Sequence, residues 1–152
     1  VQILVIGVVS MKILVINGPN MNLLGKREPE IYGSETLEDL ENYIKKEAEK
    51  LNMEVEFFQS NHEGEIIDRI HMAMEEKTDG IIINAGAFTH YSYAIRDAIK
   101  GTGIKTIEVH MSNIYTREEF RAKSVIAPVC SGQITGFGFD SYIAALYLMK
   151  RG

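Results

Sequence analysis

The chain has 152 residues, of which 45% are apolar and 24% charged, as expected for one globular domain and not for an intrinsically disordered chain. Lys and Arg number 16 against 21 Asp and Glu, and the net charge of -5 weighs against nucleic acid as the main partner. The single cysteine, Cys130, excludes an intrachain disulfide and a cysteine-rich zinc site, and it favours a cytoplasmic location.

The first ten residues are apolar but lack the basic segment that begins a signal peptide. The stretch is also too short to cross a bilayer, so we expect no membrane association. Met11 has the character of a natural start. We therefore expect residues 1–10 to be an upstream extension or a cloning remnant, and residues 11–152 to form a single domain. The alternative for residues 1–10 is an extra edge strand or a subunit contact.

Predicted strands and helices alternate along the rest of the chain. A short apolar strand is followed by a long polar loop over residues 21–33, and then by an amphipathic helix whose capping pair is Thr36 and Asp39. The remaining pattern leaves two positions open for the fifth strand. The strands are expected at 13–16, 53–58, 81–83, 104–109 and either 125–127 or 133–135, and the helices at 37–51, 63–77, 91–100 and 142–149.

This alternation predicts an α/β fold, a flavodoxin-like, doubly wound parallel sheet of five strands with helices on both faces. Ligands bind to such sheets beyond the carboxyl ends of the strands. Three polar segments follow predicted strands directly, at residues 17–20, 84–90 and 108–112. A binding or catalytic site is therefore expected where these three segments meet.

Glu108 and His110 are two apart on one predicted strand, so their side chains share a face. A carboxylate beside an imidazole fixes its tautomer and suits it to general acid chemistry. The alternative is a purely structural ion pair. Met111 and Ser112 end the same strand and could offer backbone N–H groups to a carboxylate, although a serine there is more often a turn residue.

Three further side chains are candidates for binding polar groups. His90 is expected at the start of a helix, where it could bind a hydroxyl or simply cap the helix. Arg117 and Arg121 are four apart on a short helical turn and could meet an anionic or hydroxylated ligand. The alternative for the arginines is a surface salt bridge with Glu118 or Glu119.

The long loop carries Arg27 and Tyr32. A tyrosine ordinarily has a pKa of about 10, so it acts as a base at neutral pH only if a neighbouring cation makes it easier to ionise. Arg27 could supply that charge; in the alternative, Tyr32 packs its ring and Arg27 is solvated. The usual dinucleotide, triphosphate and serine-hydrolase motifs are absent from the sequence, and the histidine spacing does not favour a metal site.

Four sequence blocks each fall at a predicted strand end or in its loop. The blocks are INGPN at 16–20 with LGKREP at 24–29 and YG at 32–33, NAG at 84–86 with TH at 89–90, EVHMSN at 108–113, and REEFR at 117–121. Together, in this order, they resemble the type II 3-dehydroquinate dehydratases, or type II dehydroquinases, over about residues 12–150, and no position expected to carry catalysis departs from the family pattern.

The resemblance implies a single catalytic domain that dehydrates 3-dehydroquinate to 3-dehydroshikimate, in the shikimate pathway or in quinate breakdown. The reaction is an anti elimination through an enolate, with no cofactor, no metal and no Schiff base. The implied catalytic residues are Tyr32 as the base, Arg27 as its activating cation, Asn20 with the Pro19 backbone holding a water, and His110 as the acid oriented by Glu108.

The resemblance also implies the substrate contacts. Met111 and Ser112 would bind the carboxylate, and Arg117 would close a lid loop over the site. The residues implied to bind ring hydroxyls are Asn84, His90 and Arg121. Asp97 is implied as a contact from a neighbouring subunit, because the family assembles trimers into dodecamers.

Three other readings of the sequence remain open at this stage. A flavin-binding electron-transfer module fits the sheet pattern, but residues 17–20 lack the Ser and Thr run that holds a flavin phosphate. A phosphoacceptor signalling domain needs an acidic pocket, whereas these strand ends carry Asn, His and Arg. A binding protein with an inactive pocket is separated from the enzyme only by an assay.

Overall fold

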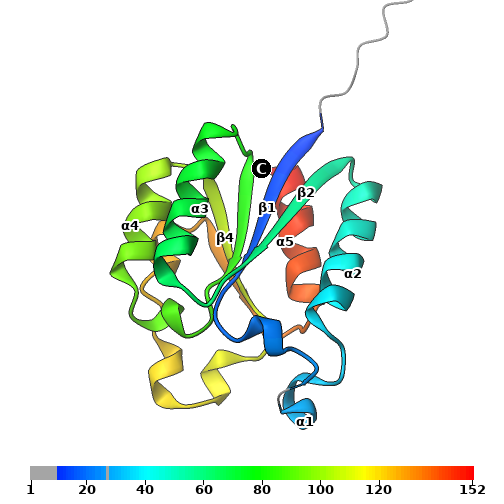
Figure 1. Cartoon of the computed structure of the whole chain (residues 1–152), viewed down its shortest axis with the longest axis vertical. Helices are drawn as coiled ribbons and strands as arrows, with labels where there is room; N and C mark the ends of the chain where they lie inside the picture. The colour runs from blue at the N-terminus through cyan, green and yellow to red at the C-terminus, as the bar shows by residue number, and fades with distance from the viewer. Residues whose placement is uncertain (1–9, 27) are drawn as a thin grey trace, which may run out of the picture.

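A five-stranded parallel sheet forms the centre of the molecule (Figure 1). The computed structural model describes residues 10–26 and 28–152, and only the backbone of residues 31 and 32. The strands follow the order β2-β1-β3-β4-β5 across the sheet. Their bounds are β1 Met11–Asn17, β2 Met53–Gln59, β3 Gly80–Asn84, β4 Lys105–His110 and β5 Gly132–Thr135.

Four helices cover the two faces of the sheet. Helices α3 (Glu63–Glu75) and α4 (Tyr93–Thr102) pack on one face, and α2 (Leu37–Lys50) and α5 (Asp140–Arg151) pack on the other (Figure 1). The short helix α1 (Pro29–Tyr32) lies beyond the carboxyl ends of the strands. The arrangement confirms the predicted doubly wound, flavodoxin-like α/β fold.

The apolar run of β1 shows why this fold forms. Successive side chains of a strand point to opposite faces, so Ile13 and Val15 join the core under α2 and α5. Leu14 and Ile16 join the second core, under α3 and α4. A strand buried on both faces needs a continuous apolar run rather than an alternating one, which is the pattern that predicts a parallel sheet.

Helices α2 and α4 begin with side-chain caps, one as predicted and one not. The predicted pair at α2 forms a complete capping box, in which Asp39 N–H donates to the Thr36 hydroxyl and Thr36 N–H donates to the Asp39 carboxylate. Helix α4, however, begins two residues later than predicted. Its cap is Ser92, whose hydroxyl accepts a hydrogen bond from Ile95 N–H at 3.0 Å, so the reading of His90 as a helix cap is wrong.

The structure settles two points about the chain from β4 onward. The fifth strand is β5, at the later of the two predicted positions, and it pairs with β4 so that Gln133 lies opposite Glu108. The short helical turn after β4 consists of two 3-10 helices, Ile114–Thr116 and Glu119–Ala122, with Arg117 between them. None of the helices in the described residues is long and apolar enough to span a membrane.

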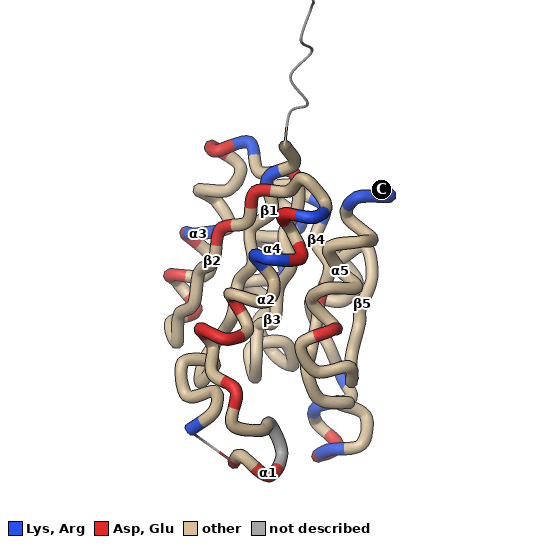
Figure 2. Tube along the Cα trace, turned by 90° about the vertical axis from the view of Figure 1, so that its right-hand side faces the viewer, with Lys and Arg blue, Asp and Glu red and all other residues tan. Residues whose placement is uncertain are grey.

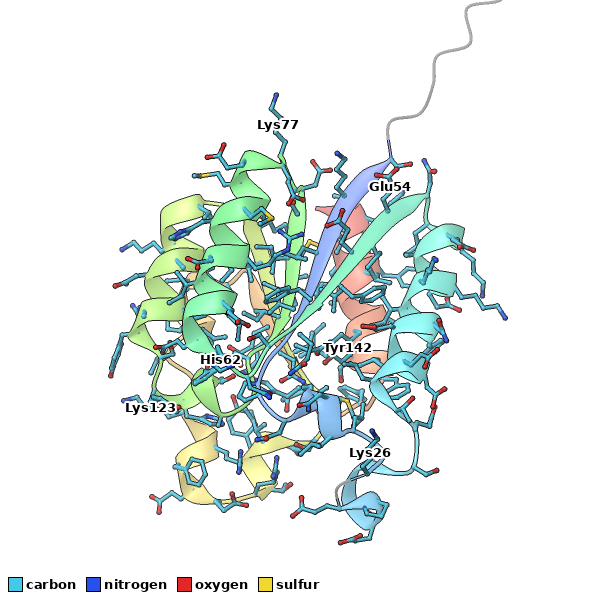
Figure 3. All side chains as sticks on the ribbon, viewed as in Figure 1. Lys26, Glu54, His62, Lys77, Lys123 and Tyr142 are labelled. Carbon is cyan, nitrogen blue, oxygen red and sulfur yellow. The ribbon has the colours of Figure 1, made fainter. Side chains whose placement is uncertain are left out.

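Both ends of the described chain lie away from the strand ends that could bind a ligand. Met11 and the C-terminus are at one end of the sheet, and α1 and the 3-10 helices are at the other (Figure 1). In the side view of Figure 2, Lys and Arg residues are interleaved with Asp and Glu along the trace. Figure 3 places Lys26 and Lys123 at the carboxyl ends of the strands, and Lys77 and Glu54 at the opposite end.

Candidate active site

A pocket opens at the carboxyl ends of β1, β3 and β4. After β1 the chain adds β2 on one side of it and then crosses to add β3 on the other side, so β1 and β3 flank the point where the strand order reverses. The pocket is lined by the last residues of β3 and β4 and by the segments that follow these three strands. They are Pro19, Asn20, Met21, Leu23, Leu24, Asn84, Gly86, Ala87, His90, His110, Met111, Ser112, Ile114, Arg117 and Arg121.

Two glycines let the loops after β1 and β3 come close together at the edge of the pocket. A Cβ on Gly18 would lie 2.6 Å from the carbonyl oxygen of Ala85, which excludes any side chain there. Gly18 N–H donates to the Asn84 carbonyl at 2.7 Å. Gly86 has a φ of +58°, a conformation that favours glycine. The tight turns bring Asn20 and Asn84 into one pocket wall.

A buried carboxylate stands behind the imidazole of His110. Nε2 of His110 lies 2.6 Å from Oε2 of Glu108, and both residues are buried. Burial by itself raises the pKa of Glu108, but hydrogen bonds from His110, Ser124 and Gln133 more than offset it and hold the pKa below its usual value. Glu108 is therefore ionised at neutral pH and accepts a hydrogen bond from Nε2–H of His110. This leaves Nδ1 as the ring nitrogen available for chemistry.

A second hydrogen-bonded chain fixes the amide of Asn84. Its Nδ2 donates to the hydroxyl of Tyr142 at 3.0 Å, and that hydroxyl donates to Oδ1 of Asn17. Tyr142 reaches the strand ends from α5, as Figure 3 shows, and it is completely buried. Oδ1 of Asn84 accepts from Gly86 N–H at 3.2 Å. The amide orientation is thus set by the protein.

His90 contacts the segment that follows the second 3-10 helix. Its Nδ1 donates to the carbonyl oxygen of Lys123 at 2.7 Å. Burial lowers the pKa of His90, so its ring is neutral at neutral pH. With the proton on Nδ1, the other nitrogen, Nε2, is an acceptor suited to a hydroxyl group.

The two arginines line the pocket from the segment after β4. Arg117 donates to the hydroxyl of Ser112 at 3.2 Å. Arg121 donates to Glu118 at 2.6 Å, as the alternative reading of the sequence expected, and it also lines the pocket. The pocket wall therefore presents two guanidinium groups, which favours an anionic ligand.

The structure brings most of the predicted site residues together. Those that line the pocket are Asn20, Asn84, His90, His110, Met111, Ser112, Arg117 and Arg121, and Glu108 lies directly behind them. Arg27 and the side chain of Tyr32 lie outside the described residues. Asp97 is exposed on α4, beside a separate surface depression with Asp68 and His71, so this chain does not bring it to its own pocket.

Sequence reasoning missed four residues that support the site. Ser124 and Gln133 hold Glu108, Tyr142 holds Asn84, and the Lys123 carbonyl holds His90. Tyr142 looked like an ordinary member of an apolar helix, and no spacing rule relates the others to their partners. In the described ranges, 10–26 and 28–152, no three His, Cys, Asp or Glu side chains are grouped as metal ligands.

Comparison with known proteins gives consistent matches over nearly the whole chain. The "3-dehydroquinate dehydratase" of Caldicellulosiruptor bescii is 68% identical over 139 residues, which cover 91% of this chain and 96% of that protein. The protein of the same name from Clostridium perfringens is 62% identical over 140 residues, which cover 92% of this chain and 97% of its own.

Solved structures agree with these relatives. The type II dehydroquinase of Butyrivibrio crossotus has a TM-score of 0.90 at 58% identity, covering 92% of this chain and 97% of that one. The type II dehydroquinase of Propionibacterium acnes has a TM-score of 0.89 at 40% identity, covering 95% of this chain and 100% of that one. The family described as dehydroquinase class II matches residues 11–150. The chain belongs to the class II dehydroquinase family.

Proposed function

We propose that this chain catalyses the type II dehydration of 3-dehydroquinate to 3-dehydroshikimate, a hydro-lyase reaction of the shikimate pathway or of quinate breakdown. Membership of the family supports the reaction. The observation that carries its chemistry is the Glu108–His110 pair, which is buried beside a pocket that two arginines line. An imidazole oriented by a carboxylate, beside a pocket lined by two guanidinium groups, suits the protonation of a leaving hydroxyl.

His110 is the proposed general acid. Glu108 accepts from Nε2, so the proton delivered to the C1 hydroxyl comes from Nδ1. The C1–O bond then breaks, the hydroxyl leaves as water, and the electron pair of the enolate forms the C1–C2 double bond. Ionised Glu108 stabilises the protonated ring before transfer and fixes its orientation throughout.

Tyr32 is the proposed base, and Arg27 the cation that makes its phenol easier to ionise. Tyr32 takes the C2 proton, and the C–H electron pair forms the enolate. Asn20 and the Pro19 backbone, which both line the pocket, are proposed to hold a water near the enolate oxygen. A fixed donor at that oxygen stabilises charge that develops only in the transition state. The proposed reaction needs no cofactor and no metal.

The remaining pocket residues are proposed to bind the substrate. Met111 and Ser112 bind its carboxylate, while Arg117 closes the lid loop through its charge. The neutral ring of His90 accepts from a hydroxyl at Nε2, a role that its hydrogen bond to Lys123 supports. The proposed partners of the other ring hydroxyls are Asn84 and Arg121.

Asp97 and the assembly form a separate part of the proposal. Asp97 is exposed on α4 and lines a depression distinct from the pocket. If it contacts substrate, it does so in the pocket of another copy of the chain. This fits a homo-oligomer, and we propose a dodecamer built from trimers, located in the cytoplasm.

The experiment that tests the function follows ultraviolet absorbance with 3-dehydroquinate as substrate, because the product is a conjugated enone. We expect turnover that survives both EDTA and borohydride treatment. Loss of activity with EDTA would implicate a metal, and loss with borohydride an imine. A folded protein without any turnover would contradict the proposed function and favour the inactive-pocket alternative, to be examined by ligand binding.

A further inference from the structure

The carboxylate of Glu108 accepts hydrogen bonds from two side chains in addition to His110. Oε1 accepts from the Ser124 hydroxyl at 2.6 Å. Oε2 accepts from Gln133 Nε2 at 2.6 Å and from His110 Nε2 at 2.6 Å. The carboxylate is completely buried. Three donors therefore fix both of its oxygens, and its plane cannot turn without breaking at least one hydrogen bond.

Ser124 and Gln133 reach this carboxylate from two different elements, and both lie behind the pocket rather than in its lining. Gln133 is the residue of β5 that pairs with Glu108 in the register of the sheet. Ser124 follows the second 3-10 helix, and its oxygen accepts from Ala127 N–H at 3.0 Å. That hydrogen bond occupies the Ser124 oxygen as an acceptor and leaves its proton to donate to Glu108.

The Gln133 amide is held at its other end by Tyr115. The Tyr115 hydroxyl donates to Oε1 of Gln133 at 2.7 Å. The Glu108 carboxylate only accepts hydrogen bonds, so the amide nitrogen faces Glu108 and the amide oxygen faces the Tyr115 hydroxyl. Tyr115 is 55% exposed and belongs to the first 3-10 helix after β4. A surface hydroxyl is thereby connected to His110 through two intervening side chains.

We propose that Ser124 and Gln133 are positioning residues for the general acid, and that Tyr115 acts through Gln133. The proposal rests on the proposed function, since it assigns these residues to the same proton transfer. They touch Glu108 rather than substrate. Their loss lets the carboxylate rotate, so the His110 ring is less well aimed at the departing hydroxyl.

The first test measures kcat and KM for Gln133→Met, Ser124→Ala and Ser124→Thr. Gln133→Met keeps the length of the side chain but removes the donor. We expect kcat to fall about tenfold in Gln133→Met and Ser124→Ala with KM within about twofold, and Ser124→Thr to recover most of the loss because it keeps a hydroxyl. Equal kcat in all three variants and the unmodified chain overturns the proposal.

The second test is a double-mutant cycle. We expect Tyr115→Phe to lower kcat about threefold in the unmodified chain and to have no further effect in the Gln133→Met background. Tyr147→Phe is the matched control, because Tyr147 is 48% exposed on α5, and its kcat should be unchanged. Equal losses from Tyr115→Phe in both backgrounds would show that Tyr115 does not act through Gln133.

The outcomes separate this proposal from the proposed function. An unmodified chain without turnover means that the function itself has failed. Turnover that is lost in His110→Ala but fully retained in the Gln133 and Ser124 variants means that only the positioning role has failed. Circular dichroism checks the folding of each variant, and if Gln133→Met does not fold, the Ser124→Ala and Ser124→Thr pair decides.

Discussion

Glu108 is a charged residue placed where an apolar one would ordinarily sit. Its neighbours on β4, Ile107 and Val109, are buried in the core on the opposite face of the sheet. An unpaired buried carboxylate is costly and would be protonated, so the charge persists only because several donors surround it. The position is unfavourable for stability alone, which is why its occupation by a carboxylate points to function.

The general acid assignment predicts a large effect from His110→Ala. We expect kcat to fall by about 10²- to 10⁴-fold, because no other group replaces the proton donor. The matched control is His62→Ala, since His62 is exposed and its side chain makes no capping hydrogen bond to α3. Steady-state kinetics measures both variants, and a kcat for His110→Ala within tenfold of the unmodified chain would remove His110 as the acid.

The base assignment predicts that Tyr32→Phe abolishes most turnover while substrate still binds. The change removes only the phenolic oxygen, so we expect kcat to fall by about three orders of magnitude with Kd little changed. Calorimetric titration measures Kd, and the absorbance assay measures kcat. Near-normal kcat in this variant would contradict the role of Tyr32.

Glu108 also predicts a dependence of stability on pH. The pKa of Glu108 in the folded chain is below its ordinary value of 4.5. The ionised carboxylate therefore contributes its full stabilisation above pH 4.5. This stabilisation is lost as the pH falls through the pKa of the folded chain. We expect the urea midpoint of the unmodified chain to fall more steeply below pH 4.5 than that of Glu108→Gln, which lacks this titration. Parallel pH dependences in the two proteins would falsify the assignment.

At the scale of elements, sequence patterns predict a helix best when its apolar stripe and its cap are both visible in the sequence. Helix α2 has an apolar stripe, with Leu40, Ile44 and Ala48 buried, and a capping box at its start. These signals come from residues close together in the chain, so they can be seen before the fold is known. The segment of 3-10 helices after β4 has a local cap at Asn113, but it is also held by hydrogen bonds from Ile114 N–H to Thr135 and from His90 to the Lys123 carbonyl, which join residues far apart in the chain.

The capping box gives a prediction at this scale. Thr36→Ala removes the hydroxyl that accepts from Asp39 N–H, and we expect it to lower the free energy of unfolding by about 1 kcal/mol. Thr36→Ser keeps the acceptor and should lose much less. Urea unfolding followed by circular dichroism checks both variants, and equal stabilities for Thr36→Ala and the unmodified chain would show that the cap is not needed.

At the scale of the whole molecule, β1 begins and α5 ends at the end of the sheet opposite the carboxyl ends of the strands (Figure 1). Each pocket residue lies at the carboxyl end of a strand or in the segment that follows it, and the family match covers residues 11–150. We therefore expect deletion of residues 1–10 to leave kcat/KM within about twofold of the full chain. The absorbance assay on the two proteins measures this, and a large loss would instead assign residues 1–10 to the active assembly.

The sequence by itself determined the order of strands and helices, the two-faced burial of the sheet and the pocket residues that directly follow strands. It could do so because apolar periodicity is local, and because parallel strands present their carboxyl ends at one edge. The pair of Glu108 and His110 was visible for the same reason, since a spacing of two places both side chains on one face of a strand.

Only the tertiary structure decided what surrounds those residues. The donors to Glu108 other than His110 are 16 and 25 residues away in sequence, and Tyr142 reaches Asn84 across 58 residues. It also placed the start of α4 at Ser92 and the fifth strand beside β4. Such contacts depend on how the sheet is ordered and how α5 packs against it, and no local pattern in the chain encodes that packing.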